Sequence, residues 1–327
     1  MRIILWLVAL MTALYCGYWV LASRGLRSGL ETALAEMRAA GTGDVTALEV
    51  GGFPYRFDVA LTEPRVTNPD GSVAWSAPGL DVHALAYQPQ KVIAIFPMMQ
   101  RLRIGRETVT VTSADLMASA RAGVATNLPL QSAESVGHAV ALTSDAGWGL
   151  VIEELRAATR LAGAPEAQQI GIEARGLTLA GLPADLITAG GALPASGERL
   201  YLDATLVLDR PVDRETPVTG VRIRSADVRS LALDWGPAGL TGSGTLTLDA
   251  AGIPEGRLEL SLRNWRAVLR LTTALGLVRP ESAPTIERAL EGLSLLGGSV
   301  DVLTLPLVFQ SGRMSLGPVP LGPAPRF

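Results

Sequence analysis

The hydrophobic pattern of the chain begins with an uncharged apolar run from Ile3 to Ala22. A helix of about 20 such residues is long enough to cross the hydrocarbon layer of a bilayer. Trp6 lies near one end of the run, and Tyr18 and Trp19 lie near the other, where aromatic side chains commonly meet the membrane surface. The run therefore predicts a single membrane anchor.

A cleaved signal peptide is the alternative interpretation of this run. Arg2 supplies a positive start and Val20-Leu21-Ala22 is an acceptable cleavage site, but the apolar run exceeds the roughly 7–15 residues typical of a signal peptide. The charges on the two sides of the run do not fix its orientation. Arg24 and Arg27 follow it, so the positive-inside rule slightly favours a cytoplasmic body.

A helical pattern continues beyond the anchor, from Ser23 to Arg38. Its apolar residues recur three or four positions apart, with charged residues between them: Leu26, Leu30, Leu34 and Met37. Gly41-Thr42-Gly43 is expected to end the helix. We therefore expect residues 1–40 to form the anchor with its helical extension, and residues 41–327 to form the body.

From Asp44 onward the pattern changes to a period of two. Between Phe53 and Leu61 every odd position is apolar, while Arg56 and Asp58 occupy the opposite face, as in a half-buried strand. Asn68-Pro69-Asp70-Gly71 predicts a turn. Further strands are expected at 72–76, 79–87, 91–96, 100–104, 107–112, 134–143, 149–155, 169–179, 199–208, 221–233, 244–249, 257–263, 299–303, 307–310 and 313–316.

Two helical segments interrupt the strands near the carboxyl terminus. The first is expected from Asn264 to Gly276, with one apolar face made of Trp265, Val268, Leu269, Thr272 and Leu275. The second is expected from Ala283 to Leu296, before Gly297-Gly298. Many strands with few helices predict a mainly β fold: an anchor helix followed by an elongated, curved antiparallel sheet. A division of the body into two lobes near 185–198 is a further hypothesis.

Composition excludes some classes of function. Charged residues make up 18% of the chain and apolar residues 48%, and the net charge is −3 with no basic run, which argues against nucleic acid as a partner. The one cysteine, Cys16, lies in the anchor, so the body has no disulfide or thiol chemistry. His83 and His138 are the only histidines, too few for a zinc site without carboxylates, and no metal or cofactor is expected.

Motifs for catalysis are weak. Gly239–Gly244 is rich in glycine, but a strand rather than a helix follows it, so a turn is favoured over a phosphate-binding loop. Ser113, His138 and Asp145 provide the residue types of a hydrolase triad without the surroundings of a nucleophile elbow. Glu153-Glu154 is interpreted as a solvated pair. We do not expect an enzyme.

Several segments carry a resemblance to a known family. They are Gly52–Phe57, Val92–Pro97, Gly242–Asp249, the stretch from Pro254 to Arg266, and Leu316–Gly322. In this order they resemble domain-of-unknown-function family 2125, bacterial membrane-anchored envelope proteins. The resemblance implies an inner-membrane anchor with the body in the periplasm, and it implies no catalytic residues. The expected architecture also looks loosely like that of the AsmA-like envelope proteins, whose curved sheets hold lipid, and this likeness is an analogy.

The alternating strands predict one apolar sheet face that two short helices cannot fully cover. Such a face closes on itself, packs on a second sheet, or binds a ligand. If it forms a groove for acyl chains, its lining is expected to include Phe53, Tyr55, Phe57, Val59, Leu61, Leu258, Leu260 and Leu262. The leading hypothesis is lipid binding or shielding in the envelope. A scaffold that binds a protein partner is the alternative, and a hydrolase is the third.

Overall fold

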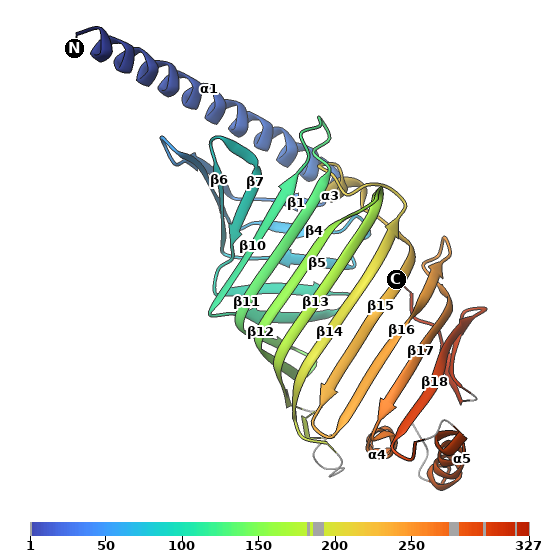
Figure 1. The fold of residues 1–327 in the computed structure, drawn as a ribbon. Helices are drawn as coiled ribbons and strands as arrows, with labels where there is room; N and C mark the ends of the chain where they lie inside the picture. The colour runs from blue at the N-terminus through green and yellow to red at the C-terminus, as the bar shows by residue number, and fades with distance from the viewer. Residues whose placement is uncertain are drawn as a thin grey trace.

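The computed structural model describes residues 2–181, 184–185, 193–274, 281–296, 299–317 and 319–326. A long N-terminal helix leads into one large curved sheet of 20 strands (Figure 1). The helices are α1 (Arg2–Ala40), α3 (Thr216–Thr219), α4 (Trp265–Ala274) and α5 (Ala283–Leu296). The mainly β fold, the curved antiparallel sheet and the two helices near the carboxyl terminus are as the sequence predicts.

The first ten strands are short. They are β1 (Gly43–Asp44), β2 (Ala47–Gly51), β3 (Arg56–Thr62), β4 (Arg65–Thr67), β5 (Val73–Ser76), β6 (Gly79–Leu85), β7 (Gln88–Ile95), β8 (Met99–Ile104), β9 (Glu107–Thr112) and β10 (Asp115–Ala122). The central strands are longer: β11 (Leu130–Ser144), β12 (Trp148–Ala162), β13 (Ala164–Gly181), β14 (Ser196–Leu208) and β15 (Ile223–Trp235). The last are β16 (Ala238–Leu248), β17 (Pro254–Arg263), β18 (Val302–Gln310), β19 (Arg313–Leu316) and β20 (Val319–Pro323).

The sheet is a meander that folds along a crease. The ten short strands form five bent segments: β1 with β2, β3 with β4, β5 with β6, β7 with β8, and β9 with β10. In each segment the chain bends once between the two strands. One member of each pair continues one wing of the sheet (β2–β3–β6–β7–β10) and the other continues a second wing (β1–β4–β5–β8–β9). The two wings meet at β11, whose first half pairs with β10 and whose second half pairs with β9.

Prolines mark this crease. Pro64, Pro78 and Pro97 occupy bends between paired strands, where a residue without a backbone N–H does not interrupt a ladder. Backbone hydrogen bonding between neighbouring segments continues at the bends, since Glu63 donates its N–H to the Pro78 carbonyl oxygen (3.0 Å). From β11 onward every strand pairs with the one before it, through β20.

Helix α1 contains the predicted anchor and its extension without interruption. It is long and apolar enough to cross a membrane, and none of the side chains in its most apolar window is buried. Its second half lies against β1, β2 and α3. From Arg24 to the end of the helix, the half-buried side chains are the ones the helical pattern singled out: Leu26, Leu30, Leu34 and Met37. The residue after the helix, Gly41, has a φ of +71°, which explains why glycine ends it.

Most predicted strands are confirmed, and four differences have physical reasons. β3 begins only at Arg56, because the Gly52-Phe53-Pro54-Tyr55 segment forms a turn. β10 was not predicted, since its run of alanines and serines carries little hydrophobic contrast. β18 is one strand that runs through Pro306, where two strands were expected. Residues Gly239–Gly244 lie inside β16 and form neither a turn nor a phosphate loop.

The glycines of β16 serve cross-strand packing. Gly242 stands opposite Leu260 of β17, and a Cβ atom at Gly242 would lie 2.6 Å from the Leu260 Cδ2 atom. Gly244 stands opposite Leu258. These two glycines therefore make room for two leucines on one face of the sheet. In a single sequence, glycines spaced in this way look the same in a strand as in a glycine-rich turn.

The two helices near the carboxyl terminus cover one end of the sheet. Trp265 of α4 and Leu290 of α5 are buried against Leu303 and Leu305 of β18. The predicted extent of α5 is confirmed, and α4 begins directly after Asn264 as expected. The predicted end of α4, at Leu275 and Gly276, lies outside the described residues. The predicted lobe boundary, 185–198, lies between β13 and β14, which pair with each other, and 186–192 fall outside the described residues.

Candidate functional site: the concave face of the sheet

Register places one continuous row of small and apolar residues across almost the whole sheet. Directly opposed residues of antiparallel strands share a face, so a chain of such pairs traces a single face. The first row passes through Phe57, Ala84, Val92, Ala120, Ala133, Thr159, Ile170, Ala204, Val228, Gly244, Leu258, Leu307 and Leu316. Thr159 is its one member with a polar group in the side chain.

Two further rows lie beside the first on the same face, with the second row between the first and the third. The second passes through Val59, Val82, Ala94, Ala118, Ser135, Ala157, Ile172, Leu202, Leu231, Gly242, Leu260 and Leu305. The third passes through Leu116, Gly137, Leu155, Ala174, Leu200, Leu233, Leu240, Leu262 and Leu303. The three rows form a band that we call the apolar floor.

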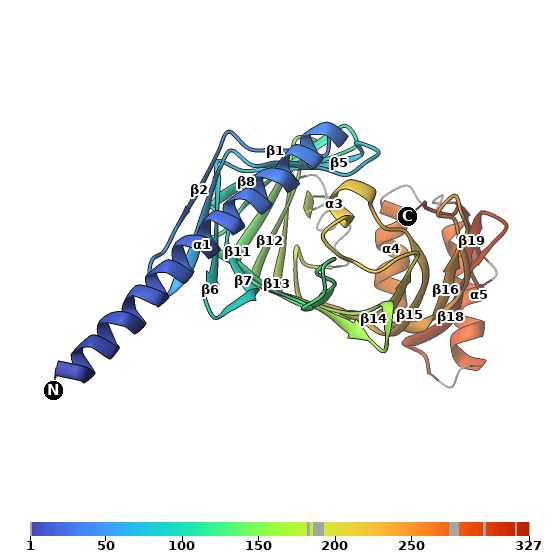
Figure 2. The same ribbon diagram turned by 90° about the horizontal axis from the view of Figure 1, so that it is seen from above.

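The apolar floor is on the concave side of the sheet. Its members pack with the helices that lie within the curve: Trp265 of α4 contacts Leu303 and Leu305, and the Trp19 ring of α1 stacks on the Phe57 ring at 6.0 Å between centroids. Figure 2 shows the sheet curving around α3 and α4. Concave faces lined by apolar side chains are where ligands with long hydrocarbon chains bind.

The floor is partly exposed in the middle and buried at both ends. Among the floor residues of the central strands, Ala157, Ile172, Leu202 and Leu231 remain partly exposed, whereas Ala174 and Ala204 are buried. By contrast, Phe57 at one end is only 3% exposed and Leu303 at the other only 1%. The floor therefore resembles a trough with a stop at each end, rather than the interior of a closed barrel or sandwich.

The structure brings together most of the residues predicted to line the groove. Phe57 and Leu258 belong to the first row, Val59 and Leu260 to the second, and Leu262 to the third. Leu61 lies on the same face of β3, opposite Leu80 of β6. These six predictions of a shared face are consistent with the register.

Phe53 and Tyr55 are corrections to the predicted lining. Both lie in the turn before β3, where the chain has left the alternation of the strand, and both are exposed (54% and 72%). Proline at position 54 and glycine at position 52, whose φ is +97°, favour this turn. Phe53 contacts the edge of the Trp19 ring instead of the floor.

Sequence reasoning missed two parts of the site. One is the part of the floor made by the central strands. The segment Leu155–Leu161 indicates it, because apolar or small residues alternate there with Arg156, Ala158 and Arg160. The other is Trp19, predicted only as an interfacial aromatic residue. Its Nε1 atom donates to the Arg56 carbonyl oxygen at 3.1 Å while its ring covers Phe57, which no pattern within the anchor predicts.

The structure has two further cavities, and the one beneath α4 adjoins the floor. One of about 290 Å³ lies beneath α4 and is lined almost entirely by apolar residues, among them Leu233, Leu240, Leu262, Val268 and Leu271. Another of about 730 Å³ lies between the β4–β5 hairpin and the segment that contains α3. Its lining mixes apolar residues with charged ones, including Trp75, Asp70, Arg210 and Arg222.

The convex face carries many charged side chains, several of them in ion pairs, together with an exposed apolar group made of Ile93, Ile95, Met117 and Val136. The Glu173 carboxylate accepts hydrogen bonds from Arg175 and from Arg199, whose Nε atom lies 2.8 Å away. These hydrogen bonds, that of Arg175 above all, hold the pKa of Glu173 below its usual value, against the opposing effect of desolvation. The convex apolar group is confined to β7, β10 and β11, and its row continues into Arg156 and Glu173. The concave rows cross almost the whole sheet, which distinguishes the concave side as the candidate binding surface.

A prediction about pH follows from Glu173. Because its pKa is lower in the folded protein than in the unfolded chain, its contribution to stability is complete above its ordinary pKa of about 4.5 and is lost as pH falls through the lowered value. We expect Glu173→Gln to lower the free energy of unfolding at pH 7 by at most about 1 kcal/mol, and to flatten the fall of the melting midpoint below pH 4.5. Thermal melts of both proteins across pH check this, and equal acid slopes contradict it.

The catalytic residue types seen in the sequence do not come together. The Ser113 hydroxyl is buried and has no hydrogen-bond partner, His138 Nδ1 lies 2.7 Å from Asp115 Oδ1, and Asp145 accepts from the Thr108 backbone N–H. His83 lies on the convex face, 2.6 Å from Asp58. Among the described residues, no group of three or more His, Cys, Asp or Glu residues is placed to hold a metal ion.

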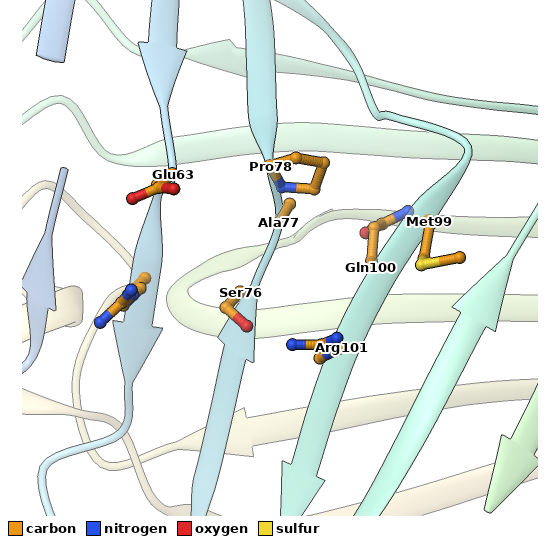
Figure 3. Close-up of a pocket in the computed structure, with 8 residues that line it drawn as sticks. Glu63, Ser76, Ala77, Pro78, Met99, Gln100 and Arg101 are labelled. Carbon is orange, nitrogen blue, oxygen red and sulfur yellow. The ribbon is translucent and has the colours of Figure 1, made fainter. Parts of the chain in front are cut away.

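A pocket of about 300 Å³ lies at the crease, away from the floor (Figure 3). Arg65, Ser76 and Arg101 stand opposite one another along it, on the face opposite to that of Trp75 and Leu102. Gln100 at its margin accepts a hydrogen bond from Trp75 Nε1 (2.8 Å). The lining of this pocket mixes charged and polar residues with Ala77, Pro78 and Met99, and the pocket is not continuous in register with the apolar floor.

The fold and the concave face together define a class of protein: an open, curved antiparallel sheet with an apolar floor, preceded by one long apolar helix. A family model matches residues 19–325, which is nearly the whole chain, and this match identifies the family. The chain belongs to domain-of-unknown-function family 2125, described as an uncharacterized protein conserved in bacteria. No curated protein and no solved structure matches the chain.

Proposed function

We propose that this protein is anchored in the inner membrane by α1 and that its periplasmic body binds or shields lipid along the apolar floor. The observation that supports lipid binding is the unbroken register of three rows of small and apolar residues, the longest of which runs from Phe57 to Leu316. A partly exposed apolar band of this length is costly in water, and burying it against acyl chains is favourable by about 25 cal/mol per Å².

The shape of the floor supports a chain-like ligand over a protein helix. Where the rows cross β7, β10 and β11 many of their members are small, including Ala94, Ala118, Ala120 and Ala133, whereas large side chains predominate from β14 to β18, so the width of the trough changes along its length. The ends are blocked by Trp19 and by α4. A flexible hydrocarbon chain fits a trough of changing width, whereas a packed helix needs regularly spaced grooves.

Photo-crosslinking from two adjacent positions tests lipid binding. Leu202 belongs to the floor, and Tyr201, its neighbour in β14, faces the convex side, where the Arg199 guanidinium lies over its ring. We expect p-benzoyl-phenylalanine at position 202 of the full chain, illuminated in membranes, to yield lipid adducts detectable by mass spectrometry. The same probe at position 201 should yield none. Equal labelling at both positions, or protein adducts at 202, contradicts the proposal.

A filling variant provides the matched control. Ala157 lies on the floor, two strands from Leu202 in the same row, and Ala158 lies on the convex face. Ala157→Phe should remove most of the lipid adduct at 202, because the ring occupies the space of the ligand. Ala158→Phe should leave the adduct unchanged. Both variants should fold, since overpacking at a partly exposed site costs at most about 1–3 kcal/mol.

The placement of the protein is tested separately. If α1 is an uncleaved anchor, the mature protein keeps the N-terminal residues, and it stays with the membrane through an alkaline wash. A soluble product that begins at Ser23 contradicts anchoring. A phosphatase fused after Phe327 should be active if the body is periplasmic, and activity of a cytosol-only reporter at the same position contradicts that placement.

A further inference from the structure

Two turns of the sheet contact the predicted membrane-spanning part of α1. The first, residues 52–55, connects β2 to β3, and the second, residues 86–87, connects β6 to β7. Tyr15 Oη donates to the Pro54 carbonyl oxygen (2.7 Å), and Tyr18 Oη donates to the Ala86 carbonyl oxygen (3.0 Å). With the bond from Trp19 to Arg56, three aromatic side chains of the anchor connect it to these turns.

The position of these contacts along α1 sets the depth of the turns. Tyr15 precedes Ala22, the end of the apolar run, by about 10 Å of helix rise. When residues 3–22 span a bilayer, a turn bonded to Tyr15 lies at or below the headgroup region on the side of the body. Beyond these contacts, α1 continues beside the sheet (Figure 2). When residues 3–22 span a bilayer, the edge of the sheet that carries the two turns therefore lies next to the membrane.

The turns have the composition that this depth requires. Gly51–Tyr55 and Leu85–Gln88 contain no charged residue. Tyr55 and Tyr87 are 72% and 73% exposed, and Phe53 and Leu85 are exposed beside them. Tyrosine is favoured where an apolar medium meets water, because its ring is apolar and its hydroxyl is polar.

Hydrogen bonding in the turns also fits a medium poor in water. A backbone carbonyl without a partner costs several kcal/mol in lipid, so segments that enter a bilayer satisfy these groups internally. Here the anchor supplies donors to Pro54, Arg56 and Ala86. On a surface facing water these carbonyls would need no such partners.

We propose that these two turns insert into the membrane surface beside the anchor and form a second lipid contact, through Phe53, Tyr55, Leu85 and Tyr87. The occupant of this exposed patch is the bilayer that holds α1, since the patch continues directly from the lipid-facing surface of the helix. This inference rests on the proposed membrane anchor. It adds that the body is fixed against the bilayer, with the Trp19 end of the trough at the membrane.

Depth-dependent quenching tests the inference on the full chain. In a Cys16→Ser background, single cysteines replace Leu10 in the anchor, Tyr87 in the second turn, and Leu295 in α5 at the far end of the body (Figure 1). Each is labelled with an environment-sensitive fluorophore and reconstituted in vesicles of phosphatidylcholine and phosphatidylglycerol with brominated acyl chains. Leu295 is a fair control because it is also exposed (59%).

We expect strong quenching at positions 10 and 87 and little at 295. Quenching at 10 but not at 87 overturns the insertion of the turns and leaves the anchor intact. Absence of quenching at 10 overturns the anchor itself, which is the failure of the proposed function. Quenching at all three positions also overturns the inference, because it shows a body that lies on the membrane without a specific contact.

Discussion

Phe57→Ala should lower the free energy of unfolding by about 3 kcal/mol, through lost burial and the cavity that remains. Phe57 is 3% exposed, and its ring stacks on Trp19, so the missing ring cannot be replaced by water or by movement of a flexible neighbour. The melting midpoint of the purified full chain should fall by roughly 5–10 °C for a change of this size in a large domain. Phe57→Asp should prevent this wing of the sheet from folding, because a charge without a partner would be buried.

The adjacent position provides the control. Asp58 lies on the convex face, where it contacts Arg56 and His83, and Asp58→Ala should cost at most about 1 kcal/mol, as exposed ion pairs do. Lipid adducts formed at position 202 should survive Phe57→Ala in the folded fraction, since Phe57 is a stop at the end of the trough. Equal destabilisation at positions 57 and 58 would contradict the assignment of the two faces.

Trp265→Ala should be the most destabilising change at the other end of the sheet, at about 4 kcal/mol. The indole is 2% exposed and packs with Leu290, Leu303 and Leu305, and its Nε1 atom donates to the Val300 carbonyl oxygen (3.1 Å). The change removes the contact that holds α4 against β18 and leaves the Val300 carbonyl with one donor fewer. Thermal or denaturant unfolding measures the loss.

Two further variants separate packing from hydrogen bonding at this site. Trp265→Phe keeps most of the ring volume and removes the Nε1 donor, so an intermediate loss of about 1–2 kcal/mol is expected. Leu295→Ala, on the exposed side of α5, should change stability by less than about 0.5 kcal/mol. If Trp265→Ala were no more destabilising than Leu295→Ala, α4 would not be packed against the sheet.

Local patterns were sufficient to predict most elements of this fold. The period of two in 57–61 and 257–263 and the helical spacing of Leu26, Leu30 and Leu34 arise from the geometry of each element alone. The Phe53–Tyr55 segment was wrong because apolar side chains at alternate positions also occur in a turn. In β10 the pattern failed because alanine and serine differ little in hydrophobicity.

The binding surface was harder to predict, because it depends on which strands are neighbours. The face shared by Phe57 and Leu258 is set by a chain of pairings through nine intervening strands, and a slip of one residue in any pairing would reverse it. The role of Trp19 depends on contacts with residues 37 positions away or more, at Arg56 and Phe57. No local pattern carries that information.

The order of the strands also bears on how the chain acquires its structure. In the described sheet each strand, or each bent segment of two short strands, pairs with the one that directly precedes it in the chain. Of all residues paired between strands, Gly256 and Phe309 are the farthest apart in sequence. Proteins in which contacting residues are close in sequence fold faster, because less loop entropy is lost before contacts form. Hairpins can therefore add one after another as the polypeptide emerges. The docking of the Tyr15–Trp19 segment on Pro54, Arg56 and Ala86 must wait for a later part of the chain, as must the contact between α1 and α3, so the sheet is expected to grow outward from the membrane.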